Sequence, residues 1–543
     1  MASAPQPDPG VHPVVCNALR VSLSAKEYKI LHDYVRNSSS LQGKLPSPAK
    51  FEAITRSKNK YNEAAMRGSL RVFLASGALM KLVDFVIGRI QKNPALKKPR
   101  TSLLHSPNFR LSLSLSLMVL LHRLLHRFFI RLRSNLRTDE AQPFRERNPR
   151  VSKALTSRYA PAVGASLAGL ALGICTQNQL RITVAIFAAT RGLESVYNVM
   201  DEKGWLVNRP WWFGSWLLMP ASLAQLVHAF VFDREATPKW FGNLILKYSP
   251  SYIHDRPDAL PVQFSWPEKD EIVDSIASIA KLRWPTFVSP ILHPATPNVL
   301  PSGLTSISPI TGSAHPSIAH LSCALLHPSS PSCGTALIHH LLLSISALAR
   351  LFTALTFARS LLNLKAWLNH PISAVNALSK QVITQTAVLS AAIGTTWGTV
   401  CLWNNILPRS ILPTQRFYLS GALAGIPFAF LGNNNRSIFL YFFRQAVDSA
   451  WKAGVKRGLW NGWRGGEVWL FVVAWAVLGS SMDCRPNSVQ GPSARKLLAW
   501  MRGEGFVDPI EKRRRRAATG PASGSGNGAE TGVGAGIGTG SSA

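Results

Sequence analysis

The chain has 543 residues and a net charge of +33 at neutral pH, with 46% hydrophobic but only 16% charged residues. Soluble domains carry roughly 25% charged residues, so this composition indicates a protein that is partly surrounded by lipid. The basic residues lie beside apolar segments and no ribonucleoprotein or zinc-finger motif accompanies them, which argues against a nucleic-acid partner.

The first 233 residues predict a polar tail followed by a membrane region. Residues 1–60 contain prolines and polar residues without an apolar core, so we expect a partly disordered tail and no secretory signal. Residues 61–233 contain five apolar segments, each long enough to cross a ~30 Å hydrocarbon core with tilt or snorkelling ends. These segments are 69–90, 109–132, 159–175, 180–200 and 213–232.

The second of these segments carries a basic stripe. Arg123, Arg127 and Arg131 recur every four residues, so on a helix they share one face. An anionic membrane surface attracts each such residue by about 1 kcal/mol. The stripe therefore predicts a contact with anionic lipid headgroups.

The middle of the chain, residues 234–322, has a different character. Fourteen prolines fall between residues 234 and 333, and no long apolar run occurs there. We expect a linker or surface loop with a short helix near 270–282.

A second membrane region follows over residues 323–485, and a tail over 486–543. The apolar segments of this region are 334–359, 382–407, 417–432, 435–455 and 466–482. The tail contains a basic run at 512–516 and a Gly/Ser/Ala-rich end, a composition that cannot bury a core and is expected to be disordered.

The two membrane regions share one pattern. The offset between matched residues drifts from 257 (Gly164 and Gly421) to 250 (Asp233 and Asp483), and an offset of 269 between Lys81 and Arg350 extends the pattern back to the first segments. Such an internal repeat indicates a duplication. The predicted fold is therefore an all-α, polytopic transmembrane protein with two homologous five-segment halves.

The fourth segment of each half carries charges near its middle. Arg191 precedes Glu194 by three residues and Arg444 precedes Asp448 by four, so each pair lies on one helix face. Charges at the bilayer centre are costly and mark either a polar path or a ligand site between the halves. The alternative is an intrahelical ion pair with a structural role.

Small residues in the third segments predict close helix packing. Glycines four residues apart let two helix backbones approach where lipid supplies no hydrophobic drive. The spacing favours packing within the protein, with a homo-oligomer as the alternative. The glycines are Gly169, Gly173, Gly421 and Gly425.

Cys323, His327 and Cys333 are weak candidates for metal ligands. They supply three ligands, whereas a closed zinc site needs four. The candidates for a fourth ligand are His315, His320, His339 and His340. We expect Cys175 and Cys401, in apolar segments, to pack as small hydrophobic residues, and the preferred prediction is no metal and no cofactor.

Two sequences resemble the transmembrane protein 135 family: RGGEVWLFVVAWAVLGSSMDC (464–484) and CALLHPSSPSC (323–333). The resemblance covers roughly 61–233 and 323–485. It implies an integral protein of peroxisomes, with mitochondria as the second location, linked to lipid metabolism and organelle dynamics; the family is related to the mitochondrial Tim translocase superfamily. The first half lacks an equivalent of Glu467, another candidate for a polar intramembrane site, because NRPWWFGSW (208–216) stands in that place.

These features together predict a non-enzymatic integral membrane protein that supports lipid handling or organelle organisation. No phosphate-binding loop, GxSxG or HExxH motif points to an enzyme. Two alternatives stay open. One is a carrier or pore that passes a small or lipid-like solute between the halves, and the other is a scaffold that recruits anionic lipid or protein partners.

Overall fold

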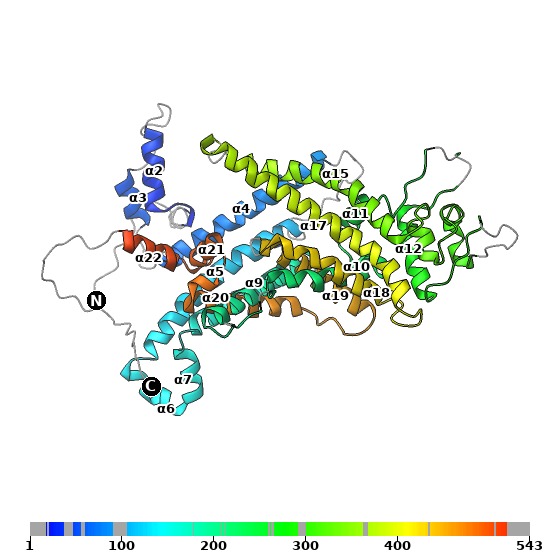
Figure 1. Cartoon of the computed structure of the whole chain (residues 1–543). Coiled ribbons are helices and arrows are strands. Elements are labelled where there is room, and N and C mark those ends of the chain that lie inside the picture. The colour runs from blue at the N-terminus through cyan, green and yellow to red at the C-terminus, as the bar shows by residue number, and fades with distance from the viewer. Residues whose placement is uncertain are drawn as a thin grey trace. The chain divides into compact units, whose positions relative to one another are not determined.

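The computed structural model is helical throughout the part of the chain that it describes, and its one β-bridge joins Thr286 to His320. Figure 1 shows the ribbon. The described residues are 18, 21–36, 47–55, 60–90, 106–176, 179–206, 208–210, 212–258, 261, 265–291, 300–361, 368–432, 435–503 and 506–518.

The chain divides into two compact units. Unit 1 comprises residues 1–176, 192–202 and 475–543, and unit 2 comprises 177–191 and 203–474. Two helices, α9 (Gln179–Glu202) and α20 (Gly466–Cys484), contribute residues to both units.

Unit 1 is built around two long helices that pack along each other. These are α4 (Lys60–Ile90) and α5 (Pro107–Asn135), and their serines Ser69 and Ser116 share a buried hydrogen bond of 2.8 Å between the hydroxyl oxygens. The other elements of this unit are α2 (Ala25–Arg36), α3 (Pro48–Thr55), η2 (Asp139–Ala141), α6 (Gln142–Arg147), α7 (Pro149–Thr156), α8 (Ala160–Ser166), η3 (Leu167–Ile174), η10 (Pro486–Ser488), α21 (Pro492–Arg502) and α22 (Pro509–Ala518).

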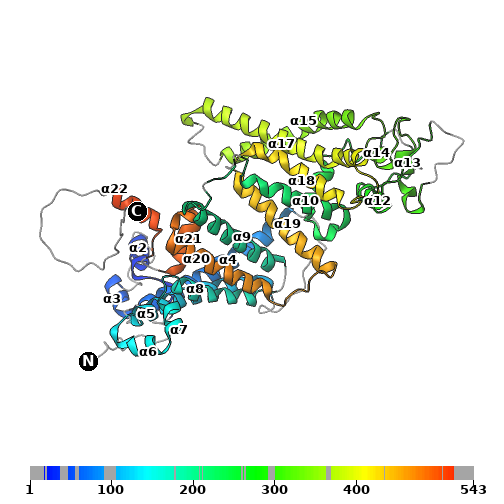
Figure 2. The ribbon, with the colours of Figure 1, turned by 60° about the horizontal axis from the view of Figure 1, so that its bottom comes forward.

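Unit 2 contains a second pair of long helices, α15 (Cys333–Ser360) and α17 (Pro371–Ile406), which lie side by side in Figures 1 and 2. Its remaining elements are η4 (Ser215–Leu217), α10 (Leu218–Phe232), η5 (Arg234–Ala236), α11 (Lys239–Lys247), α12 (Lys269–Lys281), η6 (Ser302–Ile307), α13 (Ser308–Thr311), α14 (Leu321–Leu326), α18 (Arg416–Gly425), η8 (Ile426–Leu431) and α19 (Arg436–Lys456).

Helix α10 packs against α18 and α19, and the contact with α18 is unusually close. A Cβ atom on Gly421 would lie 2.3 Å from the carbonyl oxygen of Leu223, and one on Gly425 would lie 2.3 Å from the backbone nitrogen of Pro220. Both clashes are with backbone, so only glycine fits at these two positions.

The proline-rich middle of the chain is packed rather than a plain surface loop. The expected short helix is α12, which begins with a capping box between Glu268 and Glu271. Its apolar face is completely buried, with Ile272, Ile276 and Ile279 each at 0% exposure. In α12, isoleucines at helical spacing give the helix an apolar side that packs into a core.

The described parts of the terminal regions also contain packed helices. Within 1–60, α2 and α3 pack together through stacked rings of Tyr28 and Phe51. Within 486–518, α21 contributes Arg502, whose guanidinium donates to the Asp483 carboxylate at 2.6 Å. The Gly/Ser-rich stretch 519–543 lies outside the described residues.

In the part of the chain that the structure describes, five helical segments are long and apolar enough to cross a membrane: Pro107–Asn135, Ser215–Phe232, Cys333–Ser360, Pro371–Ile406 and Gly466–Cys484. The expected segments 159–175 and 417–432 form shorter apolar helices that continue as 3₁₀-helices. The expected segments 69–90, 180–200 and 435–455 form the helices α4, α9 and α19, which are not among the five.

The glycine contact gives a stability prediction. Gly421→Ala should destabilise the protein by about 1–3 kcal/mol, because the added methyl forces α18 away from the α10 backbone. The thermal midpoint of the detergent-solubilised protein, followed by size-exclusion chromatography after heating, measures this effect. Gly173→Ala is the matched control, since a Cβ there meets nothing within 4 Å. Equal midpoints for the two variants would contradict the close contact.

Candidate metal centre

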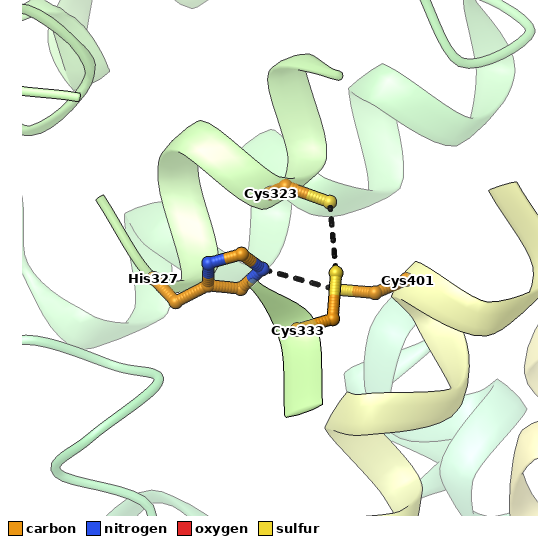
Figure 3. A group of neighbouring side chains, drawn as sticks. All are labelled: Cys323, His327, Cys333 and Cys401. Atoms are coloured by element: carbon orange, nitrogen blue, oxygen red, sulfur yellow. Dashed lines mark hydrogen bonds between the residues drawn. The ribbon is translucent and has the colours of Figure 1, made fainter. Parts of the chain in front are cut away.

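Three cysteines and one histidine of unit 2 lie together (Figure 3): Cys323, His327, Cys333 and Cys401. Cys323 lies on α14, His327 directly follows that helix, Cys333 is the first residue of α15 and Cys401 lies near the end of α17. One potential ligand atom from each residue lies within 4.8 Å of all the others. Three separate helices thus direct their ligand atoms to one point.

The local sequence explains how the first three residues meet. The backbone N–H of His327 donates to the Cys323 carbonyl at 2.9 Å, which closes the last turn of α14. The N–H of Ser330 then donates to the His327 carbonyl, and the Ser332 hydroxyl accepts from the N–H of Thr335 and caps α15. The turn between the two helices therefore places Cys333 opposite Cys323.

Two of the separations between ligand atoms are close to those of a tetrahedral zinc site. The sulfurs of Cys323 and Cys333 are 3.9 Å apart, and the Cys401 sulfur is 3.4 Å from Nε2 of His327. With Zn–S bonds of about 2.3 Å and Zn–N bonds of about 2.0 Å, tetrahedral angles give separations of about 3.8 Å and 3.5 Å. A disulfide would need about 2.05 Å between the sulfurs.

The histidine has the tautomer that a metal needs. Its Nδ1 lies 3.3 Å from the Ser330 carbonyl oxygen, an acceptor, so Nδ1–H donates there. The lone pair of Nε2 then faces the Cys401 sulfur. A backbone carbonyl that fixes the ligating histidine in this way is the usual outer shell of a zinc site.

The cluster is shielded from solvent. Cys323, His327 and Cys401 are at most 5% exposed, and Cys333 is half-buried. The hydrogen bond with Cys333 raises the pKa of the Cys323 thiol to about 12. Burial raises the pKa of the nearby Tyr252 hydroxyl, and the charges of Cys401 and Cys333 add to that rise. Four protein ligands in a largely buried site are typical of structural zinc rather than catalytic zinc.

The sequence identified three of these four residues. It proposed a histidine as the fourth, whereas the structure supplies Cys401, which we had expected to pack as a small hydrophobic residue. Two of the proposed histidines are engaged elsewhere: Nδ1 of His340 bonds Ser251 at 2.8 Å and Nδ1 of His315 bonds Ser317 at 2.7 Å. No local motif marks Cys401, because only the packing of α17 on α14 and α15 brings it near.

The charges predicted near the middle of the fourth segments have several partners. Asp448 accepts from Lys452 and from Gln179, each at 2.8 Å. The Arg444 guanidinium lies over the ring of Phe187 at 4.7 Å, and that of Arg191 lies 5.6 Å from the same ring.

The two remaining acidic candidates are buried or paired. Glu194, on α9, is 5% exposed. Glu467 forms an ion pair with Arg181, a residue whose side chain is 4% exposed. In a low dielectric, the opposite charges of the two side chains stabilise each other, which favours a structural role for Glu467.

The basic stripe of α5 divides between the interior and the surface, which corrects the expectation for Arg123. Arg123 is 4% exposed, donates to the carbonyls of Ala64 and Trp500 at 3.0 Å each, and lies over the Trp500 ring. Arg127 lies over the Tyr61 ring at 4.4 Å. Arg131 alone is an exposed member without a described partner, because α21 and the start of α4 cover the rest of the stripe.

The predicted glycines also differ from one another. Gly421 and Gly425 form the close α18–α10 contact. Gly169 is buried in η3, whereas a Cβ on Gly173 would meet only open space. Packing therefore requires glycine at positions 421 and 425 but not at position 173.

No protein-family model, curated protein or solved structure matches this chain. The resemblance to the transmembrane protein 135 family therefore depends on the short motifs alone. The candidate metal centre is inferred from the geometry of its four residues alone.

The Arg181–Glu467 pair yields a second prediction. Glu467→Gln should destabilise the protein by about 3–5 kcal/mol, because it removes the negative charge that pairs with the buried Arg181 guanidinium. The measurement is again the thermal midpoint in detergent. Replacing both residues, as Arg181→Met with Glu467→Leu, should restore much of the loss, and Glu140→Gln on the exposed η2 should have no effect. A single variant as stable as the wild type would contradict a structural pair.

Proposed function

We propose that the protein is a non-enzymatic integral membrane protein in which Cys323, His327, Cys333 and Cys401 bind one structural zinc ion. The observation that carries this proposal is the convergence of four ligand atoms within 4.8 Å in a buried site. Tetrahedral sites of sulfur and nitrogen ligands favour zinc over hard cations such as magnesium. A zinc ion here would tie α14 to α15 and α17, and so fix the short-helix region to two membrane helices.

We further propose that the chain arose by duplication of a five-helix unit. The order of elements supports this. Each half has two long helices, a short helix that continues as a 3₁₀-helix, and two more helices: α4, α5, α8–η3, α9 and α10, then α15, α17, α18–η8, α19 and α20. The fifth helix of each half contributes to the other unit. Helix α10, from the first half, belongs to unit 2, and residues 475–484 of α20, from the second half, belong to unit 1.

The cellular role that we propose is support of lipid handling or membrane organisation in peroxisomes, with mitochondria second. The motifs at 323–333 and 464–484 support it by resemblance. Within unit 2, the backbone contact of α18 with α10 leaves no room for a solute between them, which favours a scaffold over a pore. The alternative function, a carrier, would need a polar path through another part of the protein.

Zinc content tests the first proposal. The full-length protein, purified in detergent without chelators, should contain about one zinc ion per chain by elemental mass spectrometry. Cys401→Ser should lose most of this zinc, because it removes one of four ligands. Cys175→Ser, which changes a buried cysteine outside the cluster, should keep it. A zinc-free wild-type protein with intact thiols, or one with a Cys323–Cys333 disulfide, would refute the metal centre.

Membrane insertion and location can be tested together. The tagged protein should stay in the pellet after alkaline carbonate extraction, because its apolar helices lie in the bilayer. It should also co-sediment with a peroxisomal marker, or failing that with a mitochondrial one. Release into the supernatant would exclude the membrane proposal, and enrichment with other membranes would exclude the proposed organelles.

A further inference from the structure

A cavity of about 730 Å³ lies in unit 2, where the end of α15, the start of α17, η8 and the start of α19 meet. The polar residues that matter for its chemistry are Thr356, Arg359, Lys380, Gln381, Gln385 and Asn435. None of the described residues that line it is acidic. The cavity is therefore positively charged, and it offers hydrogen-bond donors beside the charge.

The two cations are available for a ligand. Arg359 lies in the last turn of α15 and Lys380 lies in the third turn of α17, and both side chains are exposed. Neither forms an ion pair or a side-chain hydrogen bond with a described residue. This distinguishes them from the paired charges elsewhere in the unit, such as Arg181 and Asp448.

A third positive element is the N-terminus of α19. Asn435 is the residue that precedes this 21-residue helix, and Ser437 and Ile438 of its first turn also line the cavity. The unsatisfied N–H groups and the dipole of a helix N-terminus attract anions. Two side-chain cations and a helix N-terminus at one cavity together indicate an anionic ligand.

The surroundings indicate that this anion carries an apolar tail. Phe430 on the cavity wall is 81% exposed and Ile383, one turn from Lys380, is 67% exposed. Only 17% of the most apolar stretch of α15 is buried in the protein, so at the proposed membrane location most of that stretch is available to contact lipid. A ligand with its charged head in the cavity can lay its tail on this apolar surface.

The position along the helices agrees with a headgroup site. Arg359 lies 26 residues after Cys333 on α15, which is about 39 Å at 1.5 Å per residue. That length exceeds the ~30 Å hydrocarbon core, so the metal centre and the cavity belong at opposite membrane faces. Lys380 precedes the buried part of α17 and lies at the same end of the helix pair as Arg359.

We propose that this cavity binds the anionic headgroup of a membrane lipid, with Arg359 and Lys380 as its counter-charges. Phosphate and carboxylate heads share this chemistry, and the apolar surroundings favour a lipid over a free ion. The inference rests on the proposed membrane location, and it does not depend on the metal centre.

The test is binding of a fluorescent phosphatidylglycerol to the full-length protein in neutral detergent. Arg359→Gln with Lys380→Gln should weaken this binding at least tenfold, because each cation beside an anionic headgroup is worth about fivefold. The matched control is Arg409→Gln with Lys239→Gln, which removes two exposed cations of unit 2 that do not line the cavity. The control should stay within twofold of the wild type.

Comparison of ligands separates the sources of the anion. Competition by unlabelled phosphatidylglycerol but not by phosphatidylcholine or millimolar inorganic phosphate supports the proposal. Equal competition by phosphatidylcholine, or by inorganic phosphate, overturns it, as does unchanged binding in the cavity variant. Zinc content and carbonate resistance of the same variants show whether such a failure concerns this site alone or the proposed function as well.

Discussion

The close approach of α18 to α10 is the constraint on which much of unit 2 depends. In lipid, the hydrophobic effect does not drive helices together, so helix association depends on close packing. Gly421 and Gly425 allow the backbones of α18 and α10 to pack closely. With α18 fixed, its buried Arg416 donates to Asn404 at 2.9 Å, and Asn404 donates to the Ser322 hydroxyl at 2.6 Å. Ser322 adjoins Cys323, so a polar chain runs from the helix contact to the metal centre.

A low dielectric explains what happens to the charges. Arg123 is satisfied by backbone carbonyls and a ring, Arg181 by Glu467, and Asp448 by Lys452 and Gln179. Such charges are tolerated because each has partners within the fold, so their role is structural. The two cations at the α15–α17 end have no such partners in the described chain, and for that reason they are better ligand candidates.

Helices α15 and α17 connect the two sites that we infer. Each carries a ligand of the metal centre at one end and a cation of the cavity towards the other. A zinc ion that fixes Cys333 and Cys401 would hold the relative position of the two helices, and with it the shape of the cavity at the far end. A structural metal can in this way serve a lipid site without any chemistry of its own.

The sequence alone indicated the helical class, the apolar segments, and three of the four residues of the cysteine–histidine cluster, because hydropathy and the spacing of Cys323, His327 and Cys333 are local properties. The duplication stays an inference from residue offsets and element order. Tertiary structure decided the rest. Cys401 joins the cluster only because α17 packs there, Arg123 turns inward because α21 and the start of α4 cover it, and the isoleucines of α12 find a core in a region whose prolines suggested a loop. Periodicity shows which side of a helix is apolar, but not which partner covers it, because that choice depends on contacts between residues far apart in the chain.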